Sequence, residues 1–137
     1  MNDDAQTPVP RLPGVQTREA IARFAGDEQR YRHWLIDFIG YGPATARQIR
    51  AALADHPLEQ AINLSHALKG RAGMLGMMEL HSIALSLEMT LRNEEPSTLW
   101  LDELERTVDE MIQEISSAFG EGKPLPAQRR ADPTREK

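Results

Sequence analysis

The chain contains no cysteine among its 137 residues. This absence excludes disulfide bonds, thiol nucleophiles and cysteine-based zinc sites, and it agrees with a reducing compartment. Aromatic residues make up only 5% of the chain, while leucine, alanine, isoleucine and methionine are plentiful, which favours helices over strands. No apolar run approaches the ~20 residues that a membrane-spanning helix needs. The sequence therefore predicts a helical protein that is not inserted in a membrane.

Basic residues are also in the minority. Lysine and arginine total 16 against 21 aspartates and glutamates, which gives a formal net charge of −5. A nucleic-acid-binding protein would need a basic face, so we expect no nucleic-acid partner. The N-terminal stretch MNDDAQTPVPRLPG is acidic and proline-rich, unlike a signal peptide. We expect a soluble cytoplasmic protein, although a soluble part of a longer membrane protein would have the same composition.

Composition divides the chain into three segments. Residues 1–16 carry three prolines and two aspartates without a periodic apolar pattern, so we expect an extended leader or linker. Residues 121–137 form a polar tail of the same kind, which we expect to be disordered. Residues 17–120 show helical periodicity almost throughout, and their length suits one domain.

The periodic region predicts a short helix followed by four long ones. Thr17 is expected to cap the short helix, which ends near Gly26, and Asp27 to cap the first long helix. Proline costs about 3 kcal/mol inside a helix, so Gly42-Pro43 predicts a kink in that long helix. The other long helices are expected at 57–75, 78–93 and 98–119, with glycines at 76 and 120 after two of them. The pattern predicts an all-α fold, an up-and-down antiparallel four-helix bundle with the short N-terminal helix on one end.

The stretch SHALKGRAGMLG, residues 65–76, places two glycines in the body of an expected helix. Glycine is about 1 kcal/mol worse than alanine there. On a helical wheel the apolar positions form one stripe, whereas His66, Gly70 and Gly73 lie within about 60° of one another on the opposite side. Lys69 borders that side, one turn from the histidine. Outward glycines remove side chains and let another molecule approach the backbone closely.

These residue types suit a phosphoryl group on nitrogen. An imidazole of ordinary pKa is largely an uncharged nucleophile at neutral pH. Its phosphoryl group would carry anionic oxygens that Lys69 can partly neutralise. Phosphoryl transfer depends mainly on in-line positioning and electrostatics, so access matters more than a deep pocket. The alternative, an ordinary surface histidine, would leave the two glycines unexplained.

The pattern H-A-L-K-G-x-A-G-x-L-G, from His66 to Gly76, resembles the signature of the histidine-containing phosphotransfer (HPt) domain of bacterial multistep phosphorelays. The likeness extends to LPGV at 12–15 and GDEQRYRHWLIDF at 26–38, and it covers residues 12–119. The resemblance implies that His66 accepts the phosphoryl group and that Lys69 stabilises it. It also implies an open approach at Gly70.

The resemblance also bears on the roles of three further residues, Gly73, Glu88 and Arg71. Gly73 would keep the approach open as Gly70 does, or would allow close packing of helices. Family members often place a polar residue of the next helix near the acceptor imidazole, and Glu88 is the candidate here. An acid at that position could hold the imidazole tautomer, but it would also repel the phosphate. Arg71 replaces a residue that is often small in the family, and we expect it to snorkel or to pair with an acid.

The resemblance also implies the partners. Receiver domains of response regulators and a hybrid sensor kinase would exchange the phosphoryl group with the chain, and catalysis with its Mg²⁺ would reside on the receiver. We expect no cofactor on this chain, which has no ATP-binding or Walker motif and would carry phosphate without making it. Ile62 and Met74 border the histidine face and are predicted to form a docking surface. We expect a monomer, either independent or the C-terminal cytoplasmic part of a membrane-bound hybrid kinase.

Two alternatives remain open. The first is a purely binding helical module that docks a receiver-like partner through the same face without using His66 chemically. The second is a metal site in the bundle, which would need several acid–histidine pairs converging from different helices. His33 with Asp37 and His56 with Glu59 have suitable spacing, but each pair stands alone, and we expect His81 to be solvated. We therefore expect no metal.

Overall fold

The computed structural model describes residues 9–55 and 58–120. Those ranges contain five helices, namely α2 (Thr17–Arg23), α3 (Glu28–Asp55), α4 (Leu58–Leu75), α5 (Met78–Arg92) and α6 (Thr98–Gly120). Within them the only β-type pairing is an isolated bridge between Val15 and Met77. The prediction of an all-α protein is confirmed. No helix in this part of the chain is both long and apolar enough to cross a membrane.

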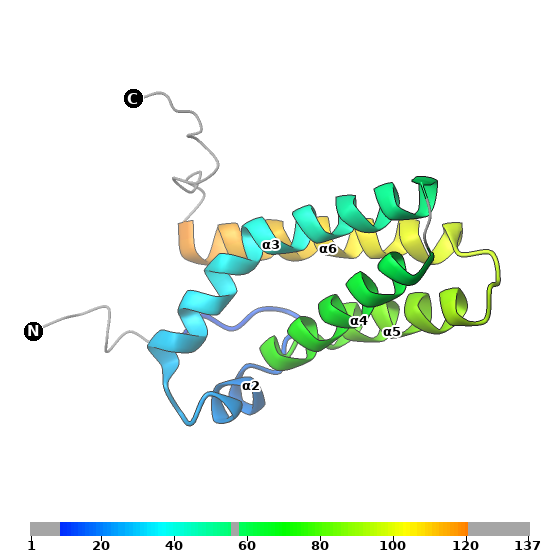
Figure 1. The fold of residues 1–137 in the computed structure, drawn as a ribbon. Helices are drawn as coiled ribbons and strands as arrows, with labels where there is room; N and C mark the ends of the chain where they lie inside the picture. Colours follow the sequence, from blue (N-terminus) through cyan, green and yellow to red (C-terminus); the bar gives the residue numbers. More distant parts are fainter. Residues whose placement is uncertain (1–8, 56–57, 121–137) are drawn as a thin grey trace, which may run out of the picture.

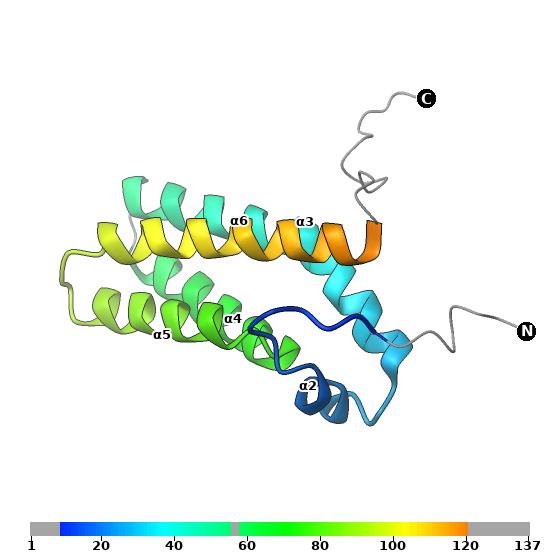
Figure 2. The ribbon, with the colours of Figure 1, turned by 180° about the vertical axis from the view of Figure 1, so that it is seen from behind.

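The four long helices lie alongside one another. α3 contacts α4 and α6, and α5 also contacts α4 and α6, so each long helix has two neighbours around a common core. Figures 1 and 2 show α3 beside α6 and α4 beside α5, with α2 at one end. The apolar positions predicted from the helical periodicity fill this core. Its largest fully buried side chains are Tyr31, Leu35, Phe38, Ile49, Leu68, Leu75, Met77, Leu80, Leu87, Leu91, Leu104 and Ile115.

The helix ends agree with the predictions except at α2. Asp27 caps α3 as expected, because its Oδ1 accepts the N–H of Arg30 at 3.0 Å. Thr17 was expected to cap α2, and this is wrong: Thr17 is the first helical residue, and Gln16 precedes it without a side-chain cap. The N–H of Gln16 instead donates to the carbonyl of Gly76 at 2.9 Å. α2 therefore begins beside a backbone hydrogen bond to the residue that follows α4. Residue 57, the predicted start of α4, lies outside the described residues.

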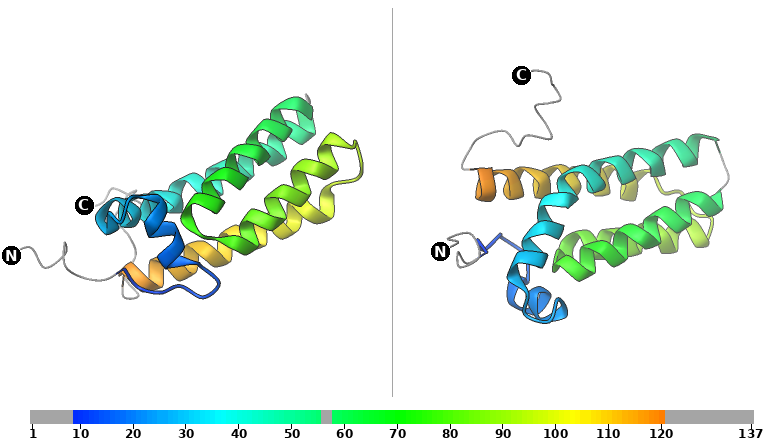
Figure 3. Two further views of the ribbon diagram at one scale, coloured as in Figure 1. Left: turned by 90° about the horizontal axis from the view of Figure 1, so that it is seen from below. Right: turned by 60° about the vertical axis from the view of Figure 1, so that its left-hand side comes forward.

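α3 is one helix with Pro43 inside it, and it turns in its cyan part (Figures 1 and 3). Pro43 has no N–H to donate, and its ring crowds the carbonyl four residues earlier, which bends a helix. Gly42 lies on the inner side, where an added Cβ would stand 2.7 Å from the Phe38 ring. The predicted kink therefore occurs within a continuous helix.

Part of the segment predicted as a leader contributes to the core. Val9 and Leu12 are buried, and the stretch around Leu12 borders the same groove as Gln113 and Ala118 of α6. Figure 2 shows this segment in dark blue ahead of α2. Its prolines interrupt any helical period, so the sequence pattern did not reveal its two buried positions. The predicted tail at residues 121–137 lies outside the described residues.

Candidate functional site

His66 stands on the outward side of α4. The buried residues of this helix form one stripe, Ala61, Ser65, Leu68, Ala72 and Leu75, on the side opposite His66, as the wheel predicted for the apolar positions. The Ser65 hydroxyl is satisfied within the helix by the carbonyl of Ala61 at 2.9 Å. His66 follows this buried serine, and 61% of its side chain is exposed. The imidazole is therefore open to a partner while its backbone is held in a packed helix.

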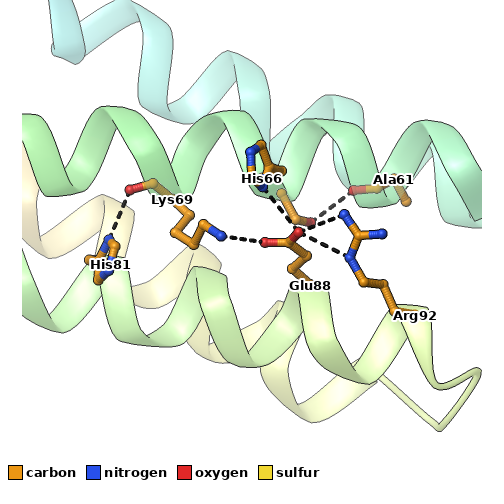
Figure 4. Close-up of polar contacts among 7 residues, drawn as sticks. Ala61, His66, Lys69, His81, Glu88 and Arg92 are labelled. Atoms are coloured by element: carbon orange, nitrogen blue, oxygen red, sulfur yellow. Dashed lines mark hydrogen bonds and ion pairs between the residues drawn. The ribbon is translucent and has the colours of Figure 1, made fainter.

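Glu88 of α5 joins His66 to two cations (Figure 4). Its side chain is only 5% exposed. One carboxylate oxygen, Oε2, lies 3.1 Å from Nδ1 of His66 and accepts from Nε and Nη2 of Arg92 at 3.1 and 2.8 Å. The other oxygen, Oε1, forms an ion pair with Nζ of Lys69 at 2.9 Å. We call these four residues the Glu88 cluster.

The cluster keeps Glu88 ionised. Burial by itself raises the pKa of a carboxyl group, but the interactions with Lys69, Arg92 and His66 outweigh it and lower the pKa of Glu88 from 4.5 to about 2. An ionised carboxylate only accepts hydrogen bonds, so Nδ1 of His66 must carry the proton that lies between them. In the neutral ring, Nε2 is then left with a free lone pair.

The two glycines of α4 differ in their surroundings. A Cβ added at Gly70 would meet nothing within 4 Å, whereas one at Gly73 would lie 3.0 Å from Nδ1 of His81. Gly73 therefore permits close packing of α5 and does not keep an approach open. The wheel placed Gly73 on the free face because it could not include α5, which covers that side of α4.

His81 is half-buried and is therefore less solvated than expected. Its Nδ1 lies 3.0 Å from the backbone carbonyl of Lys69. The missing side chain of Gly73 is what makes room for this contact. α5 therefore contacts Lys69 at two points, because His81 contacts its backbone carbonyl and Glu88 contacts its ammonium group. The side chain of Lys69 is only 20% exposed. The wheel, drawn for one helix, could not show that Lys69 pairs with Glu88.

Arg92 is a member of the site that the sequence analysis missed. A signal existed, because Glu88 and Arg92 are four residues apart on one helix, the spacing at which oppositely charged side chains meet. That pair is uninformative in the sequence alone, since such pairs are common on solvated faces. It becomes specific only when α5 is placed against α4.

The two residues predicted to form a docking surface differ in exposure. Met74 is exposed, and Ile62 is half-buried against the core. The structure adds Leu85 and Met89, which are exposed on α5 three residues before Glu88 and Arg92 respectively. Residues at this spacing are neighbours on a helix surface, so they lie beside the cluster.

Arg71 belongs to another contact. Its guanidinium lies 4.5 Å from the Trp34 ring and 4.0 Å from the Tyr41 ring, and Nη1 lies 3.5 Å from Oδ2 of Asp37. The expected pairing with an acid is confirmed. Because all three partners are on α3, these contacts of Arg71 connect α4 with the first part of that helix.

The remaining histidines were considered as metal ligands. His33 is exposed on α3, and His56 lies outside the described residues. In the part of the chain that the structure describes, no three histidine, cysteine, aspartate or glutamate residues are grouped so that they could hold a metal ion.

Comparison with protein families gives an independent assignment. The family model of the Hpt domain matches residues 33–118, which run from α3 to the last turns of α6 and include the whole Glu88 cluster. No curated protein and no solved structure matched the chain significantly. The matched region covers more than half of the chain and coincides with the helices that build the site. The chain therefore belongs to the Hpt domain family.

Proposed function

We propose that this chain relays phosphoryl groups through Nε2 of His66 between the aspartates of receiver domains. Hpt domains carry out histidine phosphotransfer in phosphorelays and work with receiver domains. The observation that carries the assignment to His66 is the contact of its Nδ1 with Glu88 at 3.1 Å, made by an imidazole whose side chain is 61% exposed. One nitrogen is held by the protein, and the other is left for a partner.

The transfer step follows from this tautomer. The lone pair of Nε2 attacks the phosphorus of an aspartyl phosphate, the N–P bond forms as the P–O bond breaks, and the aspartate leaves as a carboxylate. No proton has to leave Nε2, because the proton is already on Nδ1. In the reverse direction a receiver carboxylate attacks phosphorus, and the ring leaves as neutral imidazole.

Glu88 assists at the stage when the ring is substituted on both nitrogens. The imidazole is then positively charged, and a carboxylate on Nδ1–H stabilises that charge, as in other acid–histidine pairs. The repulsion expected between a carboxylate and a phosphoryl group is offset by Lys69 and Arg92, which already neutralise Glu88. An ammonium group has three N–H donors, so Lys69 can donate to a phosphoryl oxygen while still contacting Oε1.

The approach and the docking surface belong to the same proposal. The open space at Gly70 would admit the receiver's active-site edge, and the apolar residues around the cluster would contact it. They are Ile62, Met74, Leu85 and Met89.

The neighbour pairs of the four long helices support the finer description of the domain as an antiparallel four-helix bundle. We propose that the receiver supplies Mg²⁺ and that this chain acts as a cytoplasmic monomer.

A labelling experiment tests the proposal. Incubation with a phosphorylated receiver should give the chain an acid-labile, base-stable phosphate. His66→Gln should abolish this label while the helical circular dichroism signal stays unchanged, and His33→Gln, at an exposed position on α3, should keep it. Label that persists in His66→Gln would refute the site. An unlabelled wild type would favour a module that binds receivers without phosphotransfer.

A further inference from the structure

Arg92 and Lys69 hold different oxygens of Glu88. Arg92 donates Nε and Nη2 to Oε2 at 3.1 and 2.8 Å, and the same oxygen accepts from Nδ1 of His66 at 3.1 Å. Lys69 contacts Oε1 at 2.9 Å. Of the two cations, only Arg92 acts on the oxygen that faces the imidazole (Figure 4).

A carboxylate can rotate about the bond that joins it to the side chain. If it rotated, Oε2 would leave Nδ1, and the preference for the Nδ1–H tautomer would weaken. A guanidinium presents its N–H groups in a rigid planar fork, whereas an ammonium group is a point charge with rotating donors. The two bonds from Arg92 to a single oxygen therefore restrain the direction of the carboxylate in a way that Lys69 does not.

We propose that Arg92 is a positioning residue of the relay: it holds Oε2 of Glu88 against His66 and so keeps the proton on Nδ1 and the lone pair on Nε2. The inference rests on the proposed function for its consequence in transfer, but the tautomer itself does not depend on a partner. The side chain of Arg92 is 55% exposed, and a guanidinium has five N–H groups, of which two contact Glu88.

The first test needs only the unphosphorylated chain of 137 residues. Ring ¹⁵N chemical shifts of His66 distinguish the two tautomers. The wild type should show Nδ1–H, Arg92→Gln should shift toward a tautomer mixture, and Arg92→Lys should lie between them. Arg106→Gln, which removes exposed ion pairs on α6, should leave the shifts unchanged. Wild-type shifts in Arg92→Gln would overturn the proposal.

The second test measures single-turnover transfer from a phosphorylated receiver. Arg92→Gln should lower the maximal rate about tenfold, by analogy with the lower end of the loss seen when the outer partner of a metal-ligating histidine is removed, at an unchanged half-saturating receiver concentration. In a Glu88→Gln background the substitution should have no further effect. A change confined to the half-saturating concentration, or a full effect without Glu88, would overturn the positioning role. Failure of the wild type to be labelled would refute the relay instead, while the ring shifts still decide how Arg92 acts.

Discussion

Two faces of the bundle carry charged clusters with opposite arrangements. On the α3–α6 face, Arg50 donates to two carboxylates, Asp102 at 2.9 Å and Glu105 at 2.7 Å. On the α4–α5 face, the carboxylate of Glu88 accepts from a histidine and an arginine and pairs with a lysine. The central side chain is 50% exposed in the first cluster and 5% exposed in the second. The clusters thus use the same kinds of groups at very different burial.

That difference in burial separates a structural contact from a site. Exposed ion pairs contribute about 0–1 kcal/mol each, because water and salt screen them. A buried charge costs several kcal/mol unless it is well paired, so a carboxylate in the α4–α5 interface needs all its partners. In the Glu88 cluster one of those partners, His66, is also open to solvent. The buried charge therefore acts on a group that another molecule can reach.

The largest effect that tests this comparison is on stability. Glu88→Gln should lower the free energy of unfolding at pH 7 by about 2 kcal/mol, because bonds to a buried charged group are replaced by bonds to a neutral amide. Asp102→Asn removes the charge of an exposed partner of Arg50 and should change it by less than about 1 kcal/mol. Urea unfolding followed by circular dichroism measures both. Equal losses would mean that burial does not distinguish the clusters.

The pH dependence of the Glu88 effect makes the comparison sharper. The folded-state pKa of Glu88, about 2, lies below the ordinary value of 4.5. As pH falls, the unfolded chain therefore binds this proton first, and the stabilisation is present above pH 4.5 and lost as pH falls toward 2. The difference between wild type and Glu88→Gln should be constant from pH 7 to 5 and should shrink below that. A difference that does not change with pH would contradict an ionised carboxylate in the cluster.

The sequence alone was sufficient for most of the fold. Apolar positions at three–four spacing predicted α5 and α6 to within a residue or two, because the amphipathic pattern of a helix is local. It also predicted that Pro43 would bend α3 without dividing it. The burial of Val9 and Leu12 was not predicted, since an irregular segment packs through long-range contacts that leave no period in the sequence.

The site was predictable only where it depended on one helix. The outward position of His66 and the open space at Gly70 follow from the periodicity of α4. The contact of Gly73 with His81 and the pairing of Lys69 with Glu88 depend on how α5 is rotated and how closely it packs. Glu88 was predicted through the family resemblance. Arg92 was missed because the sequence does not show which face of α5 packs against α4.

Two glycines with no neighbouring side chain allow the two faces to be compared by the effect of blocking the space in front of them. Gly70 on α4 and Gly40 on α3 are both helical, and an added Cβ would meet nothing within 4 Å at either position. Gly70→Gln should slow phosphotransfer at least about tenfold, since a side chain beside His66 displaces the incoming group. Gly40→Gln should leave the rate unchanged, and neither change should lower stability, because glycine is the poorer helix former. Equal rates in the two variants would refute the role of open space at Gly70.

The smallest effect on stability is expected for the ion pairs of Arg50 on the α3–α6 face. Its dependence on salt concentration should distinguish it from the effect of Glu88→Gln. Glu105 and Asp102 raise the pKa of Arg50, so the arginine is charged at every pH at which the protein is studied. Arg50→Gln should lower the free energy of unfolding by less than about 1 kcal/mol. At 1 M salt the Debye length is about 3 Å, so that loss should nearly disappear, whereas the loss in Glu88→Gln should persist because Glu88 is shielded from solvent. If both losses vanished at high salt, the Glu88 cluster would be an ordinary surface network, and burial would not distinguish it from the ion pairs of Arg50.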